Sequence, residues 1–181
     1  MTKALLIIDI QNDYFPGGKM QLVGSVEAAK NTARLLEHFR FQGWPVIHVQ
    51  HIALKEGATF FLPNTSGAEI HSDVAPLEGE TVIVKHFPNA FRETDLQKTL
   101  DEIGVRDLMV AGMMTHMCID TSVRAANDLG YRVTLVGDAC ATKDLDFNGT
   151  KVAAANVQAA YLAAIDGSFA SVVSTLQVLE L

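Results

Sequence analysis

The sequence predicts a three-layer α/β/α sandwich with a mainly parallel, doubly wound sheet in the middle. Short apolar runs alternate along the chain with longer segments of helical periodicity. This alternation is typical of a parallel sheet that is covered by helices. The runs are continuously apolar, which indicates strands that are buried on both faces.

Six runs have the length and composition of strands. "ALLIID", "PVIHVQ" and "DLMVAGM" are bounded by turn residues, "TVIVK" and "RVTLVGD" have the same character, and "FASVVST" is expected to form the last strand. The expected strands cover residues 4–9, 45–50, 81–85, 107–113, 132–138 and 169–175.

Four segments between these runs have helical spacing. In the first, Ser25 is a plausible N-cap, Gly43 is a stop signal, and apolar residues recur every three or four positions. The expected helices cover residues 25–43, 94–104, 118–130 and 149–166. The irregular stretch 52–80 is the exception to this order, and a loop of that length is often functional.

Length and composition limit the kind of protein this can be. The 181 residues fit one domain, 1–181, and 49% of them are apolar, enough for a sizeable core. The formal net charge of -7 argues against a nucleic-acid or anionic-membrane partner. Cys118 and Cys140 have no paired spacing, and no segment has the length of a signal or membrane span, so we expect a soluble cytoplasmic protein.

Three reactive side chains lie at the ends of predicted strands. Asp9 ends the first strand, Lys85 ends "TVIVK", and Cys118 follows the strand "LMVAG". Ligands of open α/β sheets bind at the carboxyl ends of strands, so these side chains can share one crevice. A helix starting near Cys118 would favour the thiolate, Lys85 would lower the thiol pKa further, and Asp9 could accept the proton.

Each residue also has an ordinary structural explanation. A lone cysteine is usually core filler, an acid at a strand end often caps a turn, and a lysine is usually a solvated charge. All three residues are expected at the same edge of the sheet, which favours a catalytic site. The residues alone therefore support the structural and the catalytic interpretations about equally.

Three segments resemble the isochorismatase-like cysteine hydrolases. They are "LLIIDIQNDYF", "VIVKHFPNAF" and "GMMTHMCIDTSVRAANDLGYRVTLVGDACAT", and the resemblance covers residues 4–175. It implies a catalytic triad of Asp9, Lys85 and Cys118, in which Asp9 takes the thiol proton and later activates water. Lys85 would stabilise the thiolate, and Cys118 would attack a carbonyl carbon to form a thioester.

The resemblance also implies an oxyanion site beside the cysteine. Members of this family carry a cis peptide just before the Thr or Ala of the cysteine loop, which here would be the Met114–Thr115 bond. The backbone N–H groups of Thr115 and Cys118 would then bind the oxyanion. The side chains expected to line the substrate pocket are Gln11, Tyr14, Phe15, Phe61, Phe91 and His116.

One segment departs from the family's metal-binding branch. That branch binds a divalent metal through Asp-x-His after the second strand, whereas "VQHIALKEG" here supplies no such pair. We therefore expect no metal and no other cofactor. His48 and His51 are expected to be pocket or hydrogen-bonded residues, and Cys140 is expected to be a bystander.

The resemblance leaves three functions open. The first is a hydrolase of a small amide, ureido or carbamoyl compound that acts through Cys118. The second is an isochorismatase that cleaves a vinyl ether, and the third is a non-catalytic family member. The intact triad disfavours the third. The partner is expected to be a small-molecule substrate, and the protein is expected to be a homodimer or homotetramer, as members of this family commonly are.

Overall fold

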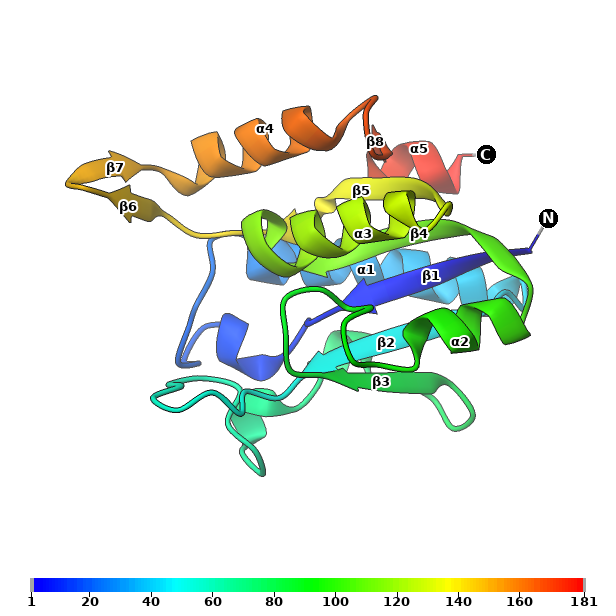
Figure 1. The fold of residues 1–181 in the computed structure, drawn as a ribbon, viewed down its shortest axis with the longest axis horizontal. Helices are drawn as coiled ribbons and strands as arrows, with labels where there is room; N and C mark the ends of the chain where they lie inside the picture. The colour runs from blue at the N-terminus through cyan, green and yellow to red at the C-terminus, as the bar shows by residue number, and fades with distance from the viewer. Residues whose placement is uncertain (1, 181) are drawn as a thin grey trace.

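The computed structural model describes residues 2–180, and its centre is a six-stranded parallel sheet (Figure 1). The strand order is β3-β2-β1-β4-β5-β8, and each neighbouring pair is parallel. The strands are β1 (Thr2–Ile8), β2 (Val46–His51), β3 (Thr81–Lys85), β4 (Val105–Met113), β5 (Arg132–Ala141) and β8 (Ser171–Val173). The expected doubly wound sheet is confirmed.

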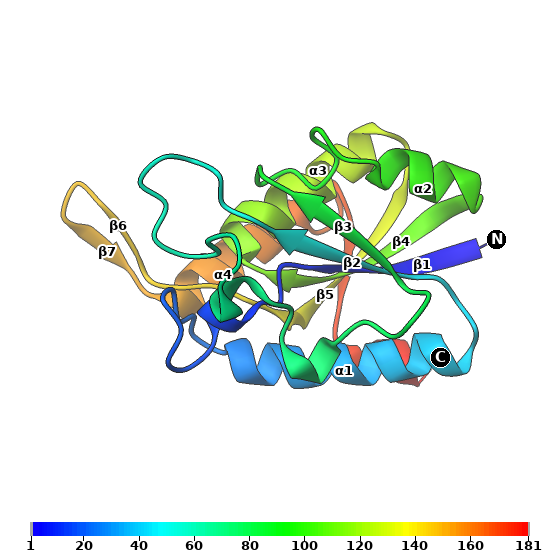
Figure 2. The ribbon, with the colours of Figure 1, turned by 90° about the horizontal axis from the view of Figure 1, so that it is seen from below.

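Helices cover both faces of this sheet (Figure 2). The long helix α1 (Ser25–Phe41) and the short C-terminal helix α5 (Thr175–Leu179) pack on one face. On the other face lie α2 (Leu96–Glu102), α3 (Asp120–Asp128) and α4 (Ala154–Ile165). Helix α1 is preceded by Gly24 as N-cap, and the expected cap Ser25 is instead its first residue.

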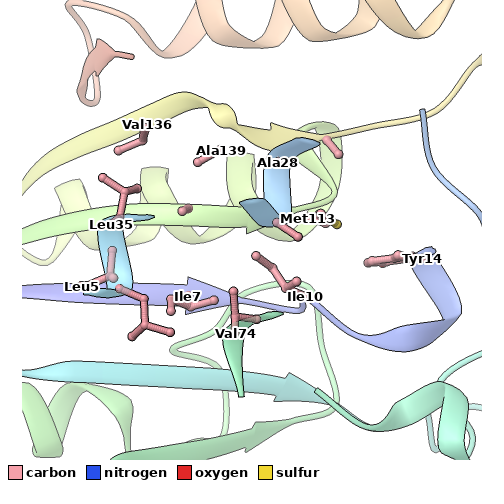
Figure 3. Close-up of a cluster of buried hydrophobic side chains, with 14 of the residues drawn as sticks. Leu5, Ile7, Ile10, Tyr14, Ala28, Leu35, Val74, Met113, Val136 and Ala139 are labelled. Atoms are coloured by element: carbon pink, nitrogen blue, oxygen red, sulfur yellow. The ribbon is translucent and has the colours of Figure 1, made fainter. Parts of the chain in front are cut away.

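The continuous apolar run of β1 is explained by two cores, one on each face of the sheet. Leu5 and Ile7 pack into the core under α1, whereas Leu6 and Ile8 pack into the core under α2 and α3. Figure 3 shows the first of these cores, in which Leu5 and Ile7 lie near Leu35 of α1. Because successive side chains of a strand point to opposite faces, a strand covered on both faces must be apolar throughout.

The segment 149–166, expected to be one helix, begins instead with the second strand of a hairpin. Strands β6 (Leu145–Phe147) and β7 (Thr150–Val152) pair antiparallel and project beyond the sheet (Figure 1). Asn148 and Gly149 join them with φ angles of 52° and 81°, the combination that two-residue hairpin turns require. Helix α4 therefore starts only at Ala154. No helix within residues 2–180 is long and apolar enough to cross a membrane.

Glu80 joins α1, β2 and the loop before β3. Its carboxylate accepts hydrogen bonds from Arg40 Nε at 2.7 Å and Nη2 at 2.8 Å, and from the Leu77 N–H at 2.9 Å. The buried His48 places Nε2 3.0 Å from the same carboxylate. Burial alone would raise the pKa of Glu80, but the bonds from Arg40, Leu77 and His48 outweigh it and lower the pKa to about 2.

Replacing Glu80 with glutamine is expected to lower the free energy of unfolding at pH 7 by about 1–3 kcal/mol. A carboxylate with a depressed pKa stabilises the fold above its unfolded pKa of about 4.3 and loses that contribution as the pH falls toward 2. The stability difference between wild type and Glu80→Gln should therefore shrink between about pH 4.5 and pH 2. Urea unfolding at a series of pH values measures it.

The matched control for this experiment is Glu78→Gln. Glu78 is exposed in the same loop and forms no ion pair with any residue of 2–180, and the substitution changes the net charge equally. We expect its effect to stay within about 0.5 kcal/mol of zero. A stability difference for Glu80→Gln that does not change with pH would contradict the proposed role of the charge.

Candidate active site

The carboxyl ends of β1, β3 and β4 bring Asp9, Lys85 and Cys118 together. Asp9 directly follows β1, Lys85 is the last residue of β3, and Cys118 lies in the π-helical turn Thr115–Ile119 that follows β4. The lysine side chain crosses the end of β2 to reach Asp9, because β2 separates β3 from β1. The convergence expected from the strand ends is therefore present.

Lys85 Nζ is the centre of this group. It lies 2.7 Å from Asp9 Oδ2 and 3.3 Å from Cys118 Sγ. It also lies 3.1 Å from the Phe87 carbonyl oxygen and 2.9 Å from Nδ1 of His51. Asp9 and Lys85 are fully buried, and Cys118 is 6% exposed, so the thiol alone of these three retains access to solvent.

Two residues of the backbone around the group have positive φ angles. Asp9 has a left-handed φ of 53°, and Gly112 of β4 has a φ of 138°. A Cβ on Gly112 would collide with the carbonyl oxygen of Ile8, so glycine permits the close approach of β4 to the end of β1. This approach brings the cysteine turn next to Asp9.

The cis peptide bond lies one residue earlier than expected. It joins Met113 to Met114, and the expectation of a cis bond between Met114 and Thr115 is wrong. Thr115 already belongs to the π-helical turn, and the Met114 carbonyl accepts hydrogen bonds from the N–H groups of Met117 and Ile119, at 3.0 and 3.2 Å. The irregular bond therefore precedes the turn. The role of the Thr115 and Cys118 N–H groups in binding an oxyanion stays a prediction.

Burial and charge favour a neutral thiol at Cys118. Burial raises the pKa of the thiol, the negative charge of Asp9 raises it further, and Lys85 lowers it. Burial would lower the pKa of Lys85, but Asp9 and Cys118 raise it above its usual value, so the lysine is an ammonium. The expected resting thiolate is thus corrected, because the ammonium is already paired with Asp9 and the sulfur is almost excluded from water.

A cavity of about 800 Å³ opens beside Cys118. Its walls are mostly aromatic and aliphatic, and the charged side chains in them are Lys55 and Glu93. The lining residues are Tyr14, His51, Ala53, Leu54, Lys55, Ala58, Phe60, Phe61, His86, Phe87, Pro88, Glu93, Met114, Met117 and Cys118. Tyr14 and Phe61 are thus the two predicted pocket aromatics that line it, and His51, which was expected to be a pocket or hydrogen-bonded residue, lines it too.

The other four predicted pocket residues lie elsewhere. Gln11 is buried and bonds to the backbone of His51, and Phe15 stacks on His71 with ring centroids 3.7 Å apart. Phe91 stacks on Tyr131, and His116 Nδ1 lies 2.6 Å from Thr142 Oγ1. These corrections share one reason: the paths of the loops decide which side chain faces the cavity, and sequence position alone does not reveal those paths.

Two residues make positioning contacts that the sequence did not specify, although His51 was expected to be a pocket or hydrogen-bonded residue. His51, at the end of β2, contacts Lys85 directly. Asp13 is buried and accepts hydrogen bonds from the N–H of Phe61 at 2.7 Å and of Lys19 at 3.1 Å, which fixes one wall of the cavity. The end of a buried strand was a usable signal for His51. Asp13 offered none, because the loop paths decide which backbone N–H groups it meets.

Three potential metal ligands also meet here. One donor atom each from Asp9, His51 and Cys118 lies within 4.8 Å of the others. Lys85 Nζ contacts all three residues at 2.7, 2.9 and 3.3 Å, so the donors already surround a cation, the ammonium of Lys85. A divalent ion would have to displace that charge. The expectation of a metal-free site stays a prediction.

The fold agrees with comparisons to known proteins, and the chain belongs to the isochorismatase family, whose Isochorismatase domain model matches residues 3–175. The chain is 56% identical over 175 residues to "Uncharacterized isochorismatase family protein YddQ" of Bacillus subtilis (strain 168), covering 97% of each chain. A crystal structure of a putative isochorismatase hydrolase from Oleispira antarctica superposes with a TM-score of 0.96, at 51% identity, covering 99% of this chain and 97% of that one. Nicotinamidase 3 of Arabidopsis thaliana is 30% identical over 77% of this chain and 73% of its own.

Proposed function

We propose that this protein hydrolyses a small neutral amide, ureido or carbamoyl compound through a thioester on Cys118. The observation that carries the proposal is the position of Lys85 Nζ, in contact with both Asp9 and Cys118 behind the wall of the cavity. A buried acid, an ammonium and a thiol in mutual contact are the groups that thiol-based acyl transfer needs. The family is one of hydrolases, and a relative named a nicotinamidase is consistent with amide chemistry.

The first half of the reaction forms the acyl-enzyme. As Cys118 Sγ attacks the carbonyl carbon, its proton moves to the carboxylate of Asp9, whose Oδ1 has no hydrogen-bond partner among residues 2–180. The Lys85 ammonium stabilises negative charge on sulfur while this proton moves. The carbonyl oxygen of the tetrahedral intermediate becomes an oxyanion, which the N–H groups of Thr115 and Cys118 would bind. The C–N bond then breaks, and Asp9 gives its proton to the departing amine.

The second half releases the acid. Asp9, again a carboxylate, accepts a proton from a water molecule that attacks the thioester carbonyl. The C–S bond of the second tetrahedral intermediate breaks, and the proton on Asp9 returns to Cys118. A neutral thiol at rest fits this cycle, because the thiolate is needed only while the carbonyl is being attacked.

The character of the cavity favours an amide over the vinyl ether of isochorismate. Isochorismate is a dicarboxylate, and a buried anion needs cationic partners. Four phenylalanine and tyrosine rings line the cavity, Lys55 is the one lysine or arginine among its lining residues, and the ammonium of Lys85 is already paired with Asp9. An uncharged substrate with an apolar acyl group suits these walls better. The third candidate function, that of a non-catalytic family member, would leave the buried acid–lysine–thiol group beside the cavity without an explanation.

A substrate panel tests this proposal. Neutral aromatic and aliphatic amides, ureido compounds and isochorismate would be incubated with the wild-type protein, and ammonia or amine release, or loss of the vinyl ether, would be followed. We expect release from at least one neutral amide or ureido compound and none from isochorismate. Cleavage of isochorismate alone, at an equal rate in the wild type and in Cys118→Ser, would overturn the proposal in favour of ether hydrolysis.

A further inference from the structure

The end of β2 supplies a fourth polar side chain to the group around Lys85. We propose that His51 is a positioning residue, whose Nδ1 accepts a hydrogen bond from the Lys85 ammonium and so holds this charge between Asp9 and Cys118. The effect of His51 on catalysis rests on the proposed function. The contact itself, at 2.9 Å, does not depend on it.

The sheet places His51 beside Lys85. His51 and Lys85 are register partners at the ends of the neighbouring parallel strands β2 and β3. Gln11 fixes the backbone of His51 from the other side: Gln11 Nε2 donates to the His51 carbonyl and the His51 N–H donates to Gln11 Oε1, both at 2.8 Å. The segment after β1 therefore sets the position of the imidazole.

The lysine needs the acceptor that His51 provides. An ammonium carries three N–H donors and has no acceptor capacity, and an unsatisfied donor in a buried site is costly. Around the fully buried Lys85 the strong acceptors are three, the Asp9 carboxylate, the Phe87 carbonyl and His51 Nδ1, because the sulfur of the neutral Cys118 thiol is only a weak acceptor. His51 and Phe87 thus give the ammonium two acceptors besides its reactive partners, which restricts its rotation as the thiol gives up its proton.

His51 can accept this bond only as a neutral imidazole. Burial lowers the pKa of His51, the positive charge of Lys85 lowers it further, and the result is a pKa of about 4. At neutral pH the ring is therefore uncharged. With Nδ1 accepting from Lys85, the ring proton is on Nε2, which leaves His51 as a hydrogen-bond donor in the wall of the cavity.

The test compares two substitutions of nearly equal shape, His51→Asn and His51→Leu. The side-chain oxygen of asparagine lies at about the position of Nδ1 and can accept from Lys85, whereas leucine offers no acceptor. His51→Phe keeps a ring but no acceptor, so it is a second variant if His51→Leu does not fold. Thermal unfolding of each variant checks the fold.

The first readout needs no substrate. In a Cys140→Ala background, the iodoacetamide reaction of Cys118 would be measured from pH 7 to 11. An ammonium without its acceptor is less stable in the charged form, so the thiolate beside it costs more. We expect the alkylation profile to move to higher pH by about one unit in His51→Leu and His51→Phe, and to stay close to wild type in His51→Asn.

The second readout uses the substrate identified by the panel. We expect kcat to fall about 10- to 100-fold in His51→Leu, with KM changed less than about threefold, and to recover most of its value in His51→Asn. Identical alkylation profiles in all variants, or equal loss in His51→Asn and His51→Leu, would overturn the role of His51. If no amide is turned over by wild type while the alkylation profiles shift as expected, the proposed substrate class fails and the role of His51 stands.

Discussion

Replacing Cys118 with serine is expected to lower kcat for an amide substrate by about 1,000-fold or more. The proposed reaction forms and breaks a bond to this sulfur. A serine hydroxyl has a much higher pKa than a thiol, so it is a much weaker nucleophile when the base beside it is a carboxylate. Because the replacement is nearly isosteric and the hydroxyl can accept the hydrogen bond from Lys85, the free energy of unfolding should change little. Steady-state kinetics and urea unfolding measure the two effects.

Cys140 is the matched control for this substitution. It is also buried, at 7% exposure against 6% for Cys118, and its Sγ donates to the Val136 carbonyl at 3.4 Å. Cys140→Ser should therefore retain kcat within about threefold of wild type. Full amide turnover by Cys118→Ser would contradict covalent catalysis, and equal loss in both variants would point to packing as its cause.

Replacing Asp9 with asparagine is expected to lower turnover while it makes Cys118 easier to alkylate. Turnover should fall by about 1,000-fold or more, because no group remains to take the thiol proton or to activate water. Alkylation of Cys118, in contrast, should move to lower pH. The negative charge of Asp9 raises the pKa of the thiol, and its removal leaves the Lys85 ammonium as the remaining charge beside the sulfur.

Asp9→Asn should also destabilise the protein by about 3–5 kcal/mol, since it leaves the buried ammonium without its charged partner. The alkylation profile distinguishes this stability loss from the proposed chemistry, because an unfolded chain would expose Cys118 and Cys140 equally. Faster modification confined to Cys118, with lost turnover, is the expected pattern. A variant whose Cys118 reacts at a higher pH than in wild type would contradict the assigned electrostatics.

The sheet could be predicted from sequence because burial on both faces leaves a clear pattern. Leu5 to Ile8 must be apolar in a strand covered by α1 on one side and by α2 and α3 on the other. The hairpin before α4 was missed, although Asn148 and Gly149 form a typical two-residue turn signal, because the Ala-rich helical pattern that follows it dominated the segment. The short helix α5 was also missed, and a five-residue helix leaves little periodicity to detect.

The site was predictable as far as strand ends determine it. The carboxyl ends of parallel strands lie at one edge, so the meeting of Asp9, Lys85 and Cys118 follows from their positions in sequence. The pKa of the thiol could not be predicted in this way. Burial and Asp9 raise it and Lys85 lowers it, and the net direction depends on distances of a few ångströms. The cavity walls were predictable only in part, since loop paths turn Tyr14 and Phe61 inward and Phe15 and His116 away.

The most direct test of the central claim is the mass of the protein during turnover. Wild-type protein would be mixed with an excess of a substrate amide, quenched in acid within milliseconds to seconds, and analysed by intact mass and by peptide mapping. The proposed mechanism predicts a mass increase equal to the acyl group less the hydrogen it replaces, located on Cys118 and absent from Cys118→Ser. Sustained turnover with no adduct at any time, together with unchanged activity of Cys118→Ser, would contradict it.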